Sequence, residues 1–155
     1  MLTPRNEVVM NLERVTLEDW ITAFVAERGG VTGEPLYRYG CTREEFEELR
    51  DMLRNAVTRN LPRRGPQAAA LCLFLAEWWR REFRGGSWSW DTVLSPLGLS
   101  VAHVILQQLY SSVRIGLAFW KRSLVQISGR RQYLGTLACE GGLPLNLLKH
   151  PGSGL

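Results

Sequence analysis

The centre of the sequence contains the run Ala68-Ala69-Ala70-Leu71-Cys72-Leu73-Phe74-Leu75-Ala76, which is apolar at every position. Pro66 stands just before this run, and proline is well tolerated in the first turn of a helix. A helix that is apolar on all sides is buried in the core of a protein. This helix is expected to become polar at Arg80-Arg81-Glu82 and to end at Gly85-Gly86. The segment therefore predicts the central element of the fold.

Two helices are predicted before the central one. Thr16-Leu17-Glu18-Asp19 and Thr42-Arg43-Glu44-Glu45 both have the pattern Ser/Thr-x-x-acid, which caps the start of a helix. After each pattern, apolar residues recur at spacings of three and four, so that they share one face. The first helix is expected to end at Gly29-Gly30 and the second near Val57. The segment 31–39 between them is expected to lie extended on the core.

The pattern after the central helix is also helical. A short helix is predicted to begin at Ser87-Trp88-Ser89-Trp90-Asp91 and to be terminated by Pro96 and Gly98, and Ser100 is expected to cap a long helix. Ser128-Gly129-Arg130-Arg131 interrupts the pattern, and another helix follows from about Gln132 to Cys139. Leu143–Leu148 looks like the start of one more packed element. The whole sequence predicts an all-α fold, an irregular bundle of five or six helices with short connections.

Charge is distributed unevenly along the 155 residues, although the net charge is only +4. Residues 1–60 contain eight Arg and eleven acidic residues, whereas residues 61–155 contain eleven Arg plus Lys and four acidic residues. We interpret the chain as one helical domain, with an acidic lead-in at 1–60 and a basic core at 61–155. We also expect it to be the amino-terminal part of a longer protein. The asymmetry indicates either a polyanionic partner or two faces that attract each other.

Cysteine use and hydropathy predict a cytoplasmic protein. Cys41, Cys72 and Cys139 are odd in number and contain no CxxC pair, which argues against a disulfide framework and a zinc site. Cys72 is expected to be a small buried hydrophobe. The amino terminus contains no apolar signal segment. The apolar run at 68–76 is about half of the ~20 residues that span a bilayer, so no membrane insertion is expected.

The usual catalytic motifs are missing from the sequence. It contains no GxxxxGK[ST], GxGxxG, HExxH or GxSxG pattern. His103 and His150 stand far apart, and His103 is expected to make only a local hydrogen bond. The acidic run Glu44–Glu48 is interpreted as a solvated helix face, with pairs to Arg50 and Arg54, rather than as a metal site. We therefore predict no enzymatic activity, no cofactor and no bound metal.

Residues 78–90 contain the first candidate binding cluster, with four Trp and three Arg. Arginine neutralises phosphates and indole rings stack on bases, so these residues fit a nucleic-acid platform. A structural interpretation of the same residues is the stronger of the two. Arginines in a last helical turn complement the helix dipole, and tryptophans at these spacings lock helices together. At least two of the four Trp are expected to face inward in either case.

A second basic cluster lies in the carboxy-terminal third of the chain. Lys121 and Arg122 precede Gly129-Arg130-Arg131, where a Gly turn at the start of a helix would hold phosphate with backbone N–H groups. Surface loop arginines are the alternative interpretation. The candidate nucleic-acid-binding residues of the two clusters are Arg80, Arg81, Arg84, Trp88, Trp90, Lys121, Arg122, Arg130 and Arg131.

Arg114 interrupts an apolar stretch and is expected to need a partner or access to water. Glu77, at the edge of the central helix, is the expected partner. Such a pair would be structural and would imply no catalytic role.

Several phrases, taken together, resemble the amino-terminal region of a family of large bacterial proteins that are encoded beside a helicase in defence islands, the Druantia-type antiphage system. The phrases are Pro35–Tyr39, Cys41–Phe46, Ala76–Arg81, Gly86–Trp90, Tyr133–Ala138 and Gly141–Pro144. The resemblance implies a role in defence against phage or other mobile DNA, and a helicase as partner. It implies no catalytic residues in this region.

Three functions remain open at this point. The first is a helical binding or scaffold domain of a defence protein, which contacts DNA or a helicase through its basic half. The second is a purely structural protein–protein interaction domain without nucleic-acid contact. The third is a fragment of an enzyme whose active site lies downstream. Salt-sensitive DNA binding separates the first from the second.

Overall fold

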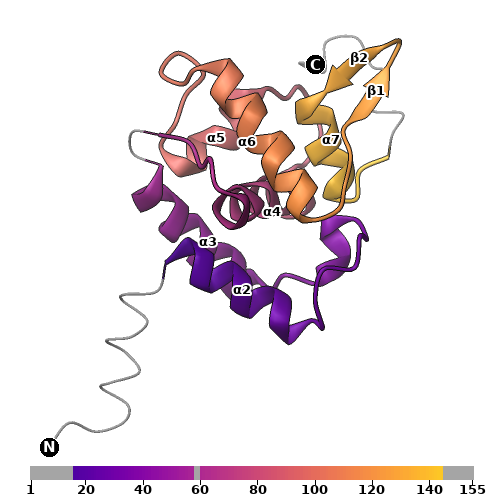
Figure 1. The fold of residues 1–155 in the computed structure, drawn as a ribbon. Helices are drawn as coiled ribbons and strands as arrows, with labels where there is room; N and C mark the ends of the chain where they lie inside the picture. Colours follow the sequence, from indigo (N-terminus) through magenta and orange to yellow (C-terminus); the bar gives the residue numbers. More distant parts are fainter. Residues whose placement is uncertain (1–15, 58–59, 145–155) are drawn as a thin grey trace, which may run out of the picture.

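The computed structural model describes residues 16–57 and 60–144 (Figure 1). It confirms the predicted all-α class, and its small antiparallel sheet has two strands. The elements are α2 (Leu17–Glu27), the 3₁₀-helix η1 (Leu36–Tyr39), α3 (Arg43–Ala56), α4 (Gly65–Glu82), α5 (Trp90–Leu94), the 3₁₀-helix η2 (Ser95–Leu97), α6 (Leu106–Phe119), β1 (Val125–Ile127), β2 (Arg130–Gln132) and α7 (Tyr133–Glu140).

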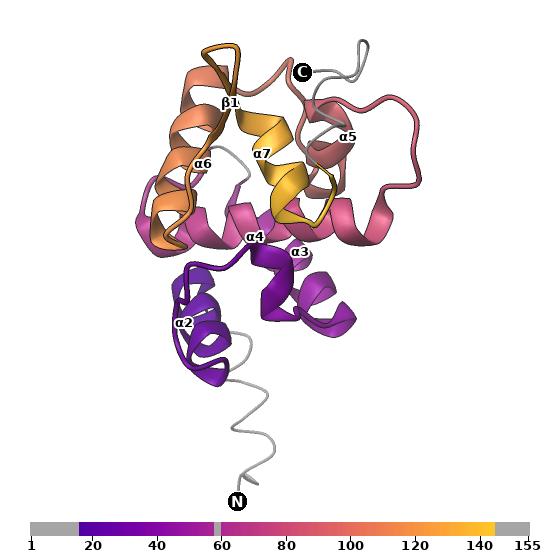
Figure 2. The same cartoon turned by 90° about the vertical axis from the view of Figure 1, so that its right-hand side faces the viewer.

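Helix α4 is the central element, as the apolar run predicts. Every residue from Ala68 to Trp79 is buried. Helices α2 and α3 lie on one side of α4, and α5, α6, α7 and the hairpin lie on the other (Figures 1 and 2). The domain therefore consists of two layers that share α4 as their common core.

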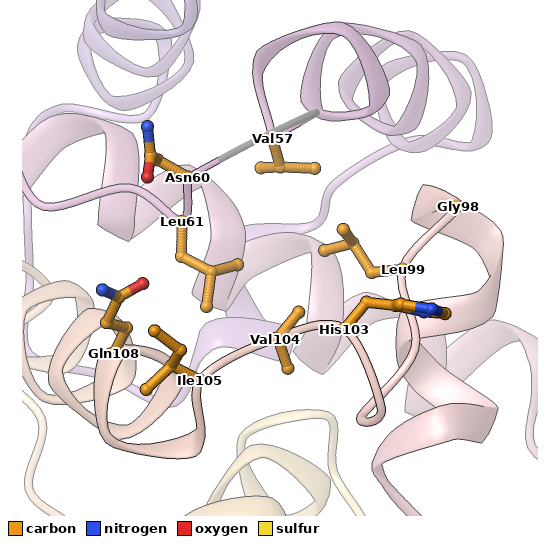
Figure 3. Close-up of a pocket in the computed structure, with 9 residues that line it drawn as sticks. All are labelled: Val57, Asn60, Leu61, Gly98, Leu99, His103, Val104, Ile105 and Gln108. Carbon is orange, nitrogen blue, oxygen red and sulfur yellow. The ribbon is translucent and has the colours of Figure 1, made fainter.

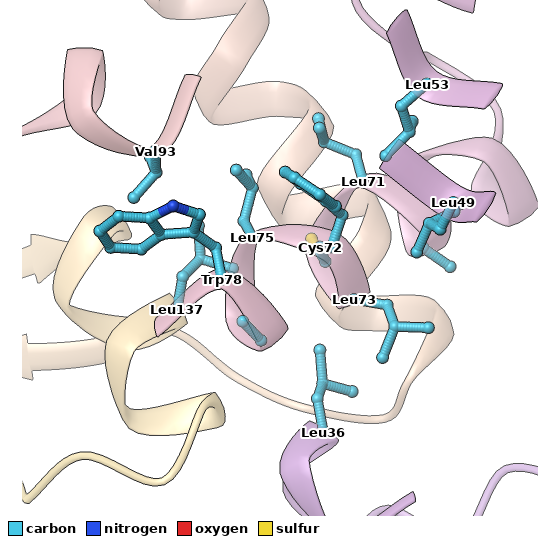
Figure 4. Packing of buried hydrophobic residues seen from close by; sticks show 14 of the residues in the cluster. Leu36, Leu49, Leu53, Leu71, Cys72, Leu73, Leu75, Trp78, Val93 and Leu137 are labelled. Atoms are coloured by element: carbon cyan, nitrogen blue, oxygen red, sulfur yellow. The ribbon is translucent and has the colours of Figure 1, made fainter. Parts of the chain in front are cut away.

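Side chains from both layers meet on α4 (Figure 4). Leu73 points toward Leu36 of η1, and Trp78 lies between Val93 of α5 and Leu137 of α7. All of these side chains except Trp78 are fully buried, and Trp78 is 8% exposed. The amino-terminal third of the chain is thus part of the same hydrophobic core as the rest.

Helices α4 and α6 lie in close contact at Gly116. A Cβ atom at this position would overlap the Ala68 carbonyl and the Cys72 sulfur. Cys72 is fully buried, as predicted, and its thiol donates to the Val113 carbonyl at 3.5 Å. The close approach requires glycine because any side chain would push the two backbones apart.

The predicted starts of α2 and α3 are confirmed. Thr16 with Asp19, and Thr42 with Glu45, form complete capping boxes. Helices α4 and α7 also lie where the sequence predicts them, with α7 at Tyr133–Glu140. The predicted element at 143–148 falls mostly outside the described residues.

Two local predictions are wrong, and an unpredicted hairpin forms where the helical pattern was expected to be interrupted. Ser100 does not cap a long helix, because its hydroxyl bonds with His103 Nδ1 and the Ala102 amide, which favours turns at 101–104 and delays α6 to Leu106. Segment 31–39 is not extended throughout, since η1 forms within it. Ser128 and Gly129 form the tight turn of a β-hairpin, in which both residues have positive φ, at 52° and 76°.

Among the described residues, no helix combines the length and the apolar character needed to cross a membrane.

Candidate nucleic-acid interface

The first basic cluster is held in an internal network. Glu77 is fully buried, and its carboxylate accepts hydrogen bonds from Arg80 at 2.7 and 2.9 Å. Arg81 Nε lies 3.4 Å from the same carboxylate, and both guanidiniums donate to the Cys41 carbonyl. The hydrogen bonds to Glu77 raise the pKa of Arg80. Arg80 and Arg81 thus join the end of α4 to the segment before α3, and both are held by the buried carboxylate of Glu77.

The tryptophans of the first cluster are mostly part of the core. The Trp88 side chain is 5% exposed, and its ring meets Trp79 edge-on at 4.5 Å between centroids. Trp79 in turn meets Trp78 at 5.1 Å. This is the arrangement that the structural interpretation predicts, and it leaves no open indole face at Trp88. Arg84 is exposed, with a local hydrogen bond to the Phe83 carbonyl.

The second basic cluster is divided between structural and exposed residues. Arg122 binds the Glu140 carboxylate at 2.9 Å and donates to the Gly33 carbonyl at 3.1 Å. Glu140 is 3% exposed and also accepts from the Leu36 amide at 3.1 Å. Lys121 is exposed. Arg122 therefore connects the carboxy-terminal layer to the segment before η1.

Arg130 and Arg131 are exposed on β2. The expected Gly turn at a helix start is wrong, because Gly129 lies in the hairpin and α7 begins only at Tyr133. No helix N-terminus supplies phosphate-binding N–H groups at Gly129. Any anion at this place must be bound by side chains.

The predicted pair between Arg114 and Glu77 is also wrong. Arg114 is exposed on α6, and its Nη1 donates to the Tyr133 hydroxyl at 2.6 Å. Glu77 is already engaged by the two arginines on its own helix. Residues 110 and 114 share a face of α6, and that face turns toward α7 rather than toward α4.

Arg114 donates to the hydroxyl of Tyr133, and Arg131 lies two residues before this tyrosine on β2. Burial acts to raise the pKa of the Tyr133 phenol, but the nearby guanidiniums of Arg131 and Arg114 outweigh it and lower the pKa. Neither guanidinium lies within 4.0 Å of a carboxylate among residues 16–57 and 60–144. Two positive charges are thus held together without a local counter-charge, an arrangement that an anion stabilises.

Arg114 and Arg131 border a surface groove of about 320 Å³. The groove lies between α6 and the hairpin, and its lining combines basic, polar and apolar side chains. Its lining residues are Arg114, Leu117, Arg122, Ser123, Leu124, Gln126 and Arg131. Because Glu140 compensates Arg122, the uncompensated charge of the groove comes from Arg114 and Arg131. We call this site the arginine groove.

A row of partly exposed aromatic rings continues from the arginine groove. Tyr133 stacks on Tyr110 with centroids 4.2 Å apart, and Tyr110 lies 6.3 Å from Trp90. The Arg114 guanidinium carbon lies 5.9 Å from the Tyr133 ring centroid. We call the rings of Tyr133, Tyr110 and Trp90 the aromatic row. Of the predicted platform, only Trp90 belongs to it.

The interface therefore combines predicted and unpredicted residues. Arg131, Arg122 and Trp90 were predicted, whereas Arg114 as a binding residue and the two tyrosines were missed. The spacing of Tyr110 and Arg114 by four residues is a signal that they share a helix face. Their proximity to Tyr133 depends on the packing of α6 against the α7 segment, which no local pattern reveals.

The charges of the two layers differ in sign, and Figure 2 shows the layers on opposite sides of α4. Residues 16–57 contain nine acidic residues and five Arg. Residues 60–144 contain ten Arg plus Lys and four acidic residues, and two of those four, Glu77 and Glu140, are buried. The layer that carries the arginine groove therefore has an almost wholly basic surface.

A different pocket of about 270 Å³ lies where α3, the segment before α4 and the start of α6 meet (Figure 3). Val57, Leu61 and Val104 supply apolar walls. Ile105 at its rim is 59% exposed, and the adjacent Leu106 is 38% exposed. They are the large hydrophobic side chains that the described part of the chain leaves exposed. His103 makes the expected local hydrogen bond here, to Ser100 at 3.1 Å.

Comparison with known proteins gives two matches. The family model of the YjiT N-terminal domain matches residues 6–143. The chain is 36% identical over 151 residues to Protein YjiT of Escherichia coli (strain K12), a match that covers 90% of this chain and 27% of that protein. The chain thus spans about a quarter of the length of the curated relative it matches. No solved structure matches.

Proposed function

The chain belongs to the YjiT N-terminal domain family, and we propose that it is a non-catalytic domain that binds nucleic acid through the arginine groove. The observation that carries the proposal is that Arg114 and Arg131 line one groove and that neither has a carboxylate partner in the described structure. Guanidinium groups bind phosphate oxygens with two hydrogen bonds in a fixed plane, which makes phosphate the fitting anion.

The uneven distribution of charge over the two layers supports the binding of a polyanion. The basic layer faces away from the acidic layer of α2 and α3 (Figure 2). A nucleic acid that approaches the basic layer is attracted, while the opposite side of the molecule repels it. The aromatic row beside the groove supplies the surfaces on which bases stack.

Fluorescence anisotropy with labelled DNA and RNA across a salt series tests the proposal. The double substitution Arg114→Gln/Arg131→Gln is expected to weaken binding about tenfold and to reduce the slope of log Kd against log salt by about two. The matched control is Arg84→Gln, an exposed arginine of the same layer outside the groove. Circular dichroism verifies that each variant keeps its helices.

Two results would overturn the proposal. One is the absence of binding by the wild-type chain at low salt. The other is equal loss of affinity in Arg84→Gln and in the double variant, which would assign binding to general charge. Incubation with the same oligonucleotides checks the second half of the proposal, because any cleavage contradicts a non-catalytic domain.

A role in antiphage defence, with a helicase as partner, forms the wider proposal. Its support is the resemblance of the six phrases to Druantia-type proteins. Deleting the complete gene is expected to raise phage plaque numbers, and co-expression with a helicase encoded beside it is expected to give a complex on size exclusion. Unchanged plaque numbers and separate elution would contradict it.

Protein–protein interaction is the second candidate function. The exposure of Ile105 and Leu106 beside an apolar pocket favours it, because soluble domains seldom expose neighbouring large hydrophobics without a partner (Figure 3). The double substitution Ile105→Ser/Leu106→Ser separates the two functions. It is expected to abolish any complex with the helicase and to leave DNA affinity unchanged.

A further inference from the structure

Two guanidiniums that line one small groove form a different kind of site from cations spread along a surface. Arg114 and Arg131 both line the arginine groove, and Arg114 also donates to the Tyr133 hydroxyl. Proteins that follow a nucleic-acid backbone place their cations along a path, one for each phosphate. The arginine groove instead concentrates two charges where one anionic group can bind.

We propose that the arginine groove binds the terminal phosphate monoester of a nucleic-acid strand. This inference rests on the proposed function and specifies which part of the nucleic acid the groove recognises. Each internal phosphodiester carries one negative charge. A phosphate monoester carries about −1.5 to −2 at neutral pH and offers three oxygens for hydrogen bonds. The two uncompensated arginines match the charge of the terminal group.

The rest of the lining fits a phosphate with several free oxygens. Ser123 and Gln126 supply an O–H donor and an N–H₂ donor beside the two guanidiniums. Arg122 also lines the groove, but it is held by Glu140 and the Gly33 carbonyl. Its role is to fix this wall rather than to add net charge. Tyr133 is a positioning residue, because its oxygen accepts a hydrogen bond from the Arg114 guanidinium.

The aromatic row favours a nucleotide over other phosphate monoesters. Tyr133, which positions the arginines, is itself stacked on Tyr110, and Trp90 follows. A phosphate in the groove places the first base of its strand near these rings. Bases at a free end are unpaired, so their faces are available for stacking.

The test compares single-stranded oligonucleotides of one sequence that carry a 5′-phosphate, a 3′-phosphate or hydroxyl groups at both ends. The wild-type 155-residue chain is expected to bind one phosphorylated form about tenfold more tightly than the hydroxyl form. The preferred form identifies the end that the groove recognises. Anisotropy at constant salt is the readout.

Three variants separate the parts of the site. Arg114→Gln/Arg131→Gln is expected to bind all forms equally weakly. Tyr133→Phe, which keeps the ring and loses the oxygen, is expected to reduce the preference for the phosphate severalfold. Tyr110→Leu is expected to weaken all forms by a similar factor, because stacking does not depend on the end group. Arg84→Gln, outside the groove, is expected to retain the full preference.

The failure of this inference differs from failure of the proposed function. Equal, salt-sensitive binding of all three oligonucleotides that is lost in the double arginine variant overturns recognition of the end and leaves nucleic-acid binding in place. A preference for the phosphate that persists in the double arginine variant overturns the assignment to this groove. The absence of binding to any form overturns both.

Discussion

Glu77 is the single residue on which the junction between α3 and α4 most depends. Its carboxylate is fully buried and binds two arginines, of which Arg81 has a side chain only 16% exposed. Burying charges costs free energy that the pairing must offset. Removing one partner of the pair therefore lowers the free energy of unfolding more than replacing both partners with apolar residues, because the remaining charge stays buried without a partner.

Glu77→Ala is expected to lower the free energy of unfolding by about 3 kcal/mol, since it leaves Arg81 without its counter-charge. Urea denaturation followed by circular dichroism measures this change. Glu82→Ala on the same helix is the control, because Glu82 is exposed and forms no ion pair in the described ranges. Its effect is expected within about 0.5 kcal/mol. A loss below about 1 kcal/mol for Glu77→Ala would contradict the structural role.

The thiol of Cys41, at the same junction, makes the stability of the fold depend on pH. Burial, reinforced by the carboxylates of Glu77 and Glu45, raises the pKa of this thiol to about 12, from an ordinary value of 9.0. The unfolded chain therefore loses its thiol proton at lower pH than the folded protein. The contribution of Cys41 to stability is complete below about pH 9 and is lost as the pH rises toward 12.

The comparison of Cys41→Ala with the wild type reveals this titration. The variant lacks the ionisable group, so the difference in unfolding free energy between the two proteins is expected to shrink above pH 9, by at most about 1.4 kcal/mol per pH unit. Urea unfolding at about pH 6, 7 and 10 measures it. Between about pH 6 and 7 the difference in unfolding free energy between the two proteins is expected to stay constant. A difference that grows with pH would show that the thiol is not stabilised in its neutral form.

At the scale of elements, the contact of α4 with α6 depends on Gly116. Gly116→Ala is expected to destabilise the domain by about 1–3 kcal/mol, even though alanine favours helices, because the added Cβ overlaps the Ala68 carbonyl and the Cys72 sulfur. Gly65→Ala is the matched control in open space near the start of α4. It is expected to be neutral or mildly stabilising. Thermal unfolding of both variants decides the point, and equal effects would contradict close packing at Gly116.

The same scale shows what the sequence could predict. Capping boxes at Thr16 and Thr42 define the starts of α2 and α3, because the bonds concerned join residues only three apart. The apolar run defines α4 for a similar local reason. Segment 100–105 was misassigned because side-chain hydrogen bonds of Ser100 compete with helix formation. The hairpin was missed because strands of three residues contain too little alternation to be recognised.

The candidate site was predictable only in part, because most of its contacts join residues that are far apart in the sequence. Arg130 and Arg131 stand out in the sequence as adjacent charges. Arg80 and Arg81 are engaged within the fold because they donate hydrogen bonds to the Cys41 carbonyl, 39 and 40 residues away. The pairing of Arg114 with Tyr133 joins residues 19 apart, across α6 and the hairpin. Such contacts follow from tertiary packing, and no spacing rule indicates them.

At the scale of the whole molecule, the two layers form an electrostatic dipole across α4. Glu27→Gln/Glu44→Gln removes two exposed charges from the acidic layer, neither of which lines the arginine groove. Association with DNA is expected to become about two- to threefold faster at low salt, with little change in dissociation, because steering acts on the encounter. Stopped-flow anisotropy separates the two rates. A change confined to dissociation would instead imply contact of DNA with the acidic layer.

The hydrogen bond from the Leu36 amide to the Glu140 carboxylate joins residues 104 positions apart. During synthesis, this bond can form only after Glu140 has been translated. At about 5–20 residues per second, roughly 5–20 s pass between the translation of the two partners. Along the chain α4 is complete at Glu82, α6 at Phe119 and α7 only at Glu140. In the later part of this interval α4 is therefore already made while the helices that cover its other side are still incomplete. Until they are complete, the growing chain exposes apolar surface of α4, and such surface promotes aggregation.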